Sequence, residues 1–260
     1  MPEPDPLARQ SPFLFRLFGW YLRWLFWRRF HAVRIARAGL PDVPPGRPVI
    51  VCSNHPSWWD PAFFILLQIS LFPGRTGFGP MDAGALGKYG VLERMGVFGI
   101  ELDSARGAAR FLRTSLRILA DPARVLWITA QGAFADPRAR PVRLLPGIAH
   151  LLRRVPEAVV LPLAMEYPFW DEGKPEALAR FGPPLQAGRE RSVAEWTSLL
   201  EAELEATMDA LAAESQRRDP RLFQPLMRGS VAVGPVYSAY RRVRALASGR
   251  AMDVSHGGGE

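Results

Sequence analysis

The amino-acid sequence predicts an α/β fold in which strands alternate with helices, with an aromatic and basic membrane-associated helix on its N-terminal side. Two observations lead to this fold class. Short apolar runs typical of buried strands alternate along the chain with helical segments. A length of 260 residues with 48% hydrophobic content suits one domain with a substantial core.

Four short apolar runs predict strands, at residues 49–53, 97–101, 124–129 and 158–165. The helices are predicted from amphipathic spacing and start signals, at residues 62–72, 104–120, 147–154 and 193–217. The first of these helices follows Asp60-Pro61, because aspartate suits an N-cap and proline suits the first turn. Strand and helix therefore alternate through the middle of the chain.

Residues 12–35 are rich in Phe, Trp, Leu and Tyr, and arginines interrupt them. The longest charge-free run is far below the ~20 residues that span a bilayer. Arg16 and Arg23 share one helical face, and tryptophans lie on other faces, at Trp20, Trp24 and Trp27. This pattern predicts a helix at a membrane interface. The alternative is an amphipathic helix that packs on the protein's own core.

We therefore expect three parts along the chain. Residues 1–40 form a membrane-associating helical segment, and residues 41–218 form the α/β domain. Residues 219–260 carry a second basic helix at 236–247 and a disordered tail from residue 255.

The formal net charge of +8 favours an anionic partner. No nucleic-acid motif, P-loop or dinucleotide fingerprint is visible, so we expect a membrane surface and no nucleic acid. The single cysteine, Cys52, favours a reducing compartment, and the absence of a Cys/His cluster predicts no metal. The expected location is the cytoplasmic face of the cell membrane.

His55 and Asp60 form the most informative pattern in the sequence. His55 falls on the loop between a predicted strand and helix, and Asp60 lies five residues further on at the helix start. The carboxylate can bind one ring nitrogen and leave the other free to accept a proton. No G-x-S-x-G elbow supplies a serine nucleophile, so the pair suits direct attack by a substrate hydroxyl on an acyl donor. The alternative is a loop histidine beside an unrelated helix cap.

Asn54-His55-x4-Asp60, directly after a short apolar strand, resembles the first motif of the PlsC-type glycerolipid acyltransferase family. Four further stretches resemble later motifs of that family in order and spacing, at residues 96–102, 127–132, 160–164 and 180–185. The resemblance implies an α/β fold, with a mixed sheet flanked by helices and an N-terminal helical membrane anchor. It also implies an acyl-CoA or acyl carrier protein donor, a lipid acceptor and no further cofactor.

In this resemblance, His55 would deprotonate the acceptor hydroxyl and Asp60 would orient His55. The matching motif positions imply substrate contacts at Asn54, Glu101, Leu102, Gln131 and Gly132. The chain departs from the family where an arginine that grips the acceptor phosphate is replaced by Leu102, and where Pro-Glu-Gly is replaced by Ala130-Gln131-Gly132.

These departures bear on the acceptor. Leucine cannot bind phosphate, and glutamine keeps a hydrogen-bonding shape without the charge. An acceptor with a neutral hydroxyl becomes plausible. Alternatively, an arginine of the following loop supplies the phosphate contact, at Arg138, Arg140 or Arg143, and the reaction is ordinary 1-acylglycerol-3-phosphate acylation. A lipid-binding protein that has lost catalysis, and a hydrolase, are the remaining alternatives.

Overall fold

The structure is a computed structural model that describes residues 5–102 and 104–230. Its described residues form one nine-stranded sheet in the order β4-β3-β5-β2-β6-β7-β1-β9, with β8 paired to β6. The strands are β1 Ala32–Ala36, β2 Val49–Ser53, β3 Thr76–Asp82, β4 Val97–Ile100, β5 Arg124–Thr129, β6 Val159–Glu166, β7 Glu176–Phe181, β8 Leu185–Gln186 and β9 Phe223–Arg228.

The sheet is mixed, as the resemblance implies. Strands β4, β3, β5, β2 and β6 run parallel to one another. Strand β7 is antiparallel to β6, β1 is parallel to β7, and β9 is antiparallel to β1. The loops that follow the five parallel strands therefore meet at one edge of the sheet.

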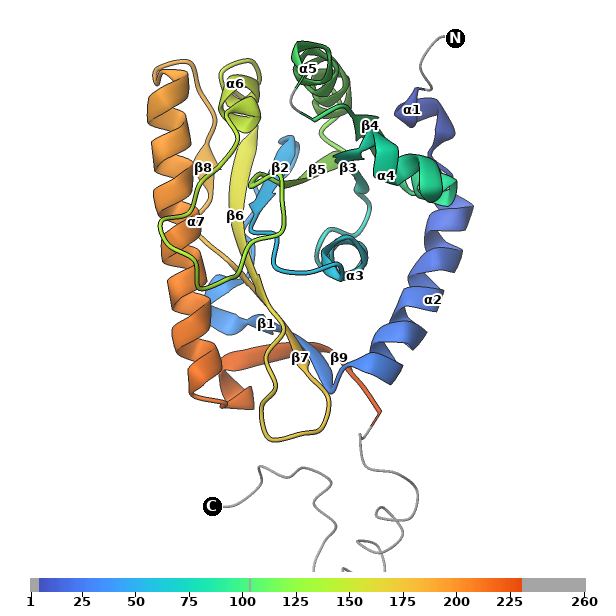
Figure 1. Cartoon of the computed structure of the whole chain (residues 1–260), viewed down its shortest axis with the longest axis vertical. Coiled ribbons are helices and arrows are strands. Elements are labelled where there is room, and N and C mark those ends of the chain that lie inside the picture. The colour runs from blue at the N-terminus through green and yellow to red at the C-terminus, as the bar shows by residue number, and fades with distance from the viewer. Residues whose placement is uncertain (1–4, 103, 231–260) are drawn as a thin grey trace, which may run out of the picture.

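Helices cover both faces of the sheet. They are α1 Pro6–Arg9, α2 Pro12–Arg29, α3 Asp60–Leu71, α4 Ala83–Lys88, α5 Ala105–Leu119, α6 Gly147–Leu152 and α7 Val193–Gln216. Buried side chains of α2 and α3 form one hydrophobic core with the sheet, and those of α5, α6 and α7 form the other. Figure 1 shows α2 and α7 on opposite sides of the molecule.

Most sequence predictions within the central part are confirmed to within two residues. The strands at 49–53 and 124–129 have the predicted bounds, and α5 begins after the Ser104 cap. Asp60 is the first residue of α3 rather than its N-cap, and no side chain caps this helix. The carboxylate of Asp60 is therefore not used to cap the helix.

The predicted helix across residues 12–35 is corrected at its C-terminal end. Helix α2 ends at Arg29, and Ala32–Ala36 forms β1, which is buried between β7 and β9. Strand β9, which belongs to the part of the chain beyond residue 218, is also a strand of this sheet and pairs with β1. Strands β3, β7 and β8 are additions to the prediction, and the helix predicted at 236–247 lies outside the described residues.

Helix α2 packs on α3 through a narrow face and leaves its aromatic face exposed. Gly19 makes the approach possible, because a Cβ there would lie 2.5 Å from the Ile69 side chain of α3. The exposed side of α2 carries Phe13, Leu17, Trp20, Tyr21, Trp24 and Trp27. Among the described residues, no helix has the length and apolar character needed to cross a membrane.

Candidate active site

The loop from β2 to α3 is anchored by Asn54 at the edge where the parallel strands end. Its amide Nδ2 donates to the Met165 carbonyl at 3.0 Å, and its Oδ1 accepts from the Met165 N–H at 2.9 Å. Asn54 is buried, and both polar atoms of its side chain are hydrogen-bonded to the Met165 backbone. This geometry favours a role in holding the loop against the end of β6 over the substrate contact expected for Asn54.

His55 and Asp60 lie together as the sequence predicts. The His55 Nδ1 is 2.6 Å from Asp60 Oδ2, which leaves Nε2 as the free ring nitrogen. Asp60 is completely buried, and its Oδ2 also accepts from the Ser57 N–H at 3.1 Å. Burial of an ionised carboxylate is costly unless hydrogen-bond donors compensate it, and these donors do so.

Tyr167 is the third side chain of this cluster, and the sequence analysis missed it. Its hydroxyl donates to Asp60 Oδ1 at 2.7 Å. Burial, the negative charge of Asp60 and the hydrogen bond to it raise the pKa of Tyr167 well above its ordinary value. The phenol therefore remains a donor. Its position directly after an apolar strand could have been noted, but nothing in the spacing placed it against Asp60.

Aromatic side chains enclose the buried carboxylate and connect it to α2. The Phe30 ring lies 5.0 Å from Trp59 and 5.8 Å from Tyr167, measured between ring centroids. Phe26 contacts Trp59 at 5.3 Å and Phe63 at 6.1 Å. Phe26 and Phe30, at the C-terminal end of α2, therefore pack against Trp59 and Tyr167, which surround Asp60. These rings keep water away from the Asp60 carboxylate.

Gln131 lies beside His55, and Gly132 follows it in the chain. The Gln131 Oε1 accepts from the His55 N–H at 2.8 Å. Gly132 has a φ of 74°, and a Cβ there would come within 2.5 Å of Leu145. Glycine is needed at this turn because other residues are strained at positive φ and would clash. Both residues therefore shape the loop that faces the histidine.

Glu101 and Leu102 follow β4, which is the edge strand, and β3 and β5 separate β4 from β2. At the usual strand spacing, β4 and β2 are roughly 14 Å apart. Leu102 is 41% exposed, and the Glu101 carboxylate accepts from the Ser104 hydroxyl at 3.3 Å. Their contact with a substrate stays a prediction.

The arginines of the loop after β5 are engaged with acidic residues. Arg143 Nη1 lies 3.4 Å from Glu201 Oε2 on α7. The other two are paired as well, Arg140 with Asp209 of α7 and Arg138 with Asp136. The expectation that one of them contacts an acceptor phosphate at the dyad finds no geometric support in these ion pairs.

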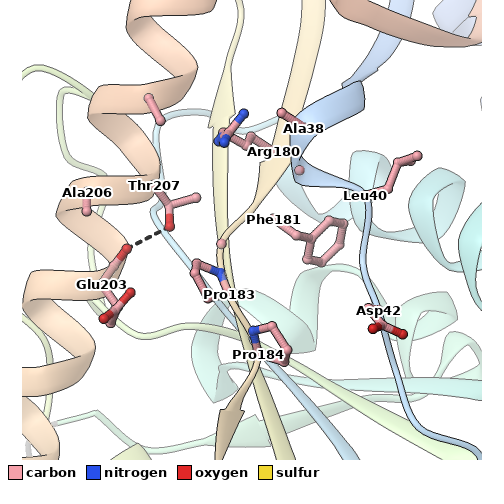
Figure 2. A pocket seen from close by; sticks show the side chains of 13 residues that line it. Ala38, Leu40, Asp42, Arg180, Phe181, Pro183, Pro184, Glu203, Ala206 and Thr207 are labelled. Carbon is pink, nitrogen blue, oxygen red and sulfur yellow. Dashed lines mark hydrogen bonds between the residues drawn. The ribbon is translucent and has the colours of Figure 1, made fainter.

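A cavity of about 370 Å³ lies away from the dyad. It is bounded by α7, the end of β7 and the segment after β1, and Figure 2 shows Arg180 and Thr207 among its lining side chains. Arg180 is paired there with Glu214 at 2.5 Å. None of the predicted site residues lines this cavity, so the candidate site is placed at the dyad rather than at this cavity.

The described residues contain no group of three His, Cys, Asp or Glu side chains placed to hold a metal ion. The side chains that the structure brings together at the site are those of the dyad, Tyr167 and Gln131. A free imidazole nitrogen beside a buried carboxylate can accept a proton from a bound hydroxyl.

In fold, the chain is acyltransferase-like. It superposes on the crystal structure of the 1-acyl-sn-glycerophosphate (LPA) acyltransferase, PlsC, from Thermotoga maritima with a TM-score of 0.52. The match covers 76% of this chain and 78% of that chain, at 17% sequence identity, which supports likeness of fold. No family model matches the sequence, and no curated protein matches it.

Proposed function

We propose that this protein is an O-acyltransferase of the PlsC type that moves a fatty acyl group from acyl-CoA or acyl carrier protein to a lipid hydroxyl. The observation that carries the proposal is the 2.6 Å contact between His55 and the fully buried Asp60. The acyltransferase-like fold supports it. Acyl-CoA and acyl carrier protein are donors in this scheme, so no further cofactor is required.

The dyad performs the transfer in two proton movements. The acceptor oxygen attacks the thioester carbonyl while His55 Nε2 takes the hydroxyl proton, and Asp60 stabilises the imidazolium that forms. The tetrahedral intermediate then collapses, the C–S bond breaks, and the proton on Nε2 passes to the leaving thiolate. The products are an ester and a free thiol, and His55 returns to its neutral form.

The aromatic face of α2 supports binding to a membrane surface. Trp20, Trp24 and Trp27 are exposed on one side of the helix, and Arg16 and Arg23 flank them. Tryptophan suits the interface between headgroups and acyl chains, and arginine suits anionic headgroups. The proposed location is the cytoplasmic face of the cell membrane, where the acceptor lipid resides.

A second candidate is acylation of 1-acylglycerol-3-phosphate, which the fold similarity to an LPA acyltransferase favours. It would require a phosphate contact other than the one expected at Leu102. A lipid-binding protein without catalysis is a third possibility, and the intact dyad argues against it.

The test is release of thiol from acyl-CoA or acyl carrier protein in the presence of mixed lipid extracts, with acylated products identified by mass spectrometry. The proposal predicts release that depends on both the lipid acceptor and His55. Fatty acid release without any acceptor would indicate a hydrolase instead. Absence of release with every donor and extract would contradict an enzymatic function.

A further inference from the structure

Phe134 is the side chain that covers the proposed base. Its ring centroid lies 4.3 Å from that of His55, with 37° between the ring planes. The backbone fixes this position, because the Ala135 N–H donates to the His55 carbonyl at 3.0 Å. Phe134 is nevertheless 62% exposed, so one side of its ring touches the base and the remainder is open to an incoming substrate.

The loop that carries Phe134 is fastened to α7 by its polar groups. The Val142 N–H donates to Glu205 at 2.8 Å, and the Leu144 N–H donates to Glu201 at 3.0 Å. The ion pairs of Arg140 and Arg143 also lead to α7. These contacts direct Arg140 and Arg143 toward the helix. Arg138 pairs with Asp136 within the loop, and the Phe134 ring is directed at His55.

Two other exposed apolar side chains lie on the segments around the dyad. Trp58, which is 65% exposed, precedes Trp59 and Asp60 on the loop from β2. Leu145, which is 50% exposed, packs over Gly132. Phe134, Trp58 and Leu145 come from the two loops that build the site. Both loops that build the site therefore present exposed apolar side chains, and that of Phe134 contacts the His55 ring.

A phosphate placed beside these side chains would lose hydration without gaining an ionic partner from them. An uncharged lipid alcohol has no such penalty, and its alkyl part gains contact with the rings. We propose that Phe134 is a specificity-determining residue, and that the acceptor is a lipid alcohol with no charged group beside the reacting hydroxyl. This inference rests on the proposed function.

The experiment compares two acceptors that differ only in a phosphate, 1-acylglycerol and 1-acylglycerol-3-phosphate with the same acyl chain. The full-length protein is assayed by thiol release, with acyl-CoA and with acylated acyl carrier protein as donors. The wild type is expected to have a kcat/KM for 1-acylglycerol about tenfold or more above that for the phosphate, which is the scale of one unmade charged hydrogen bond.

Phe134→Arg adds a guanidinium beside the base and is expected to shift this ratio toward the phosphate by about tenfold or more. Phe134→Leu keeps the position apolar and is expected to retain the preference for 1-acylglycerol. Leu40→Arg is the matched control, because it adds the same charge at an exposed apolar position that lines the remote cavity. Its ratio is expected to equal that of the wild type.

A wild-type preference for 1-acylglycerol-3-phosphate would overturn the inference and leave the acyltransferase function in place. An equal shift in Leu40→Arg and Phe134→Arg would also overturn it, because the effect would then be one of net charge. If Phe134→Arg fails to fold, Phe134→Lys is the second cationic variant and is expected to shift the ratio in the same direction. An unchanged ratio in a folded cationic variant would also overturn the inference. No thiol release with either acceptor or with lipid extracts would overturn the proposed function itself.

Discussion

The Tyr167 hydroxyl donates to Asp60 Oδ1 at 2.7 Å, while Asp60 Oδ2 lies 2.6 Å from His55 Nδ1. One buried carboxylate thus has a partner on each oxygen, from two segments far apart in the chain. Tyr167 fixes the rotation of the carboxylate, and the carboxylate in turn fixes the imidazole ring. Tyr167 is therefore a positioning residue for the proposed base, since it acts through Asp60.

Tyr167→Phe is expected to lower kcat by about tenfold and to leave KM nearly unchanged, because it leaves Asp60 Oδ1 without its donor. Tyr89→Phe, at an exposed position, serves as the control. An unchanged kcat in Tyr167→Phe would refute the positioning role.

The raised pKa of Tyr167 also predicts how stability depends on alkaline pH. An unfolded tyrosine loses its proton near pH ~10, whereas the folded protein keeps the Tyr167 proton to higher pH. The unfolded state therefore binds fewer protons above pH ~10, and the free energy of unfolding falls as pH rises. Urea titrations across this range should show a steeper fall in the wild type than in Tyr167→Phe. Equal slopes would contradict the prediction.

Replacement of Trp20, Trp24 and Trp27 by serine is expected to weaken binding to phospholipid vesicles by about tenfold or more. Each exposed tryptophan would lose apolar contact with the interface. Co-sedimentation with vesicles measures the effect, and Tyr89→Ser with Val91→Ser removes exposed apolar groups elsewhere as a control. Unchanged co-sedimentation of the tryptophan variant would count against an interfacial role for α2.

The Glu176 carboxylate neutralises the positive charge of Arg34, which is buried in the sheet. Its Oε2 accepts from Arg34 Nε at 2.9 Å, its Oε1 lies 2.6 Å from His31 Nδ1, and both Glu176 and Arg34 are buried. Glu176→Gln would leave the guanidinium without its charge partner, so we expect a loss of about 3–5 kcal/mol in the free energy of unfolding. Chemical denaturation measures it. Glu190→Gln, in an exposed ion pair, should change little, and equal losses in both variants would contradict the argument.

The sequence was informative where structure depends on neighbouring residues. The strand at 49–53 follows from a local apolar run, and the contact of His55 with Asp60 follows from five residues of spacing across a strand-to-helix loop. Gln131 was found through the order of the motifs, although its bond to the His55 backbone could not be specified.

Long-range relationships were not accessible in this way. Tyr167 meets Asp60 across 107 positions, because β6 pairs with β2. The boundary between α2 and β1 was missed because no glycine or proline separates Arg29 from Ala32. Arg140 and Arg143 are candidates for a phosphate contact in the sequence, and only the packing of α7 shows which acidic residues pair with them.

The central claim is that His55 is the base that deprotonates a lipid hydroxyl. The most direct measurement is acceptor-dependent thiol release from the acyl donor by wild type and His55→Ala, each checked for an unaltered thermal unfolding transition. The claim predicts a fall of about 10²–10⁴-fold in turnover for a folded His55→Ala protein. A folded His55→Ala variant that retains near-wild-type turnover would contradict it.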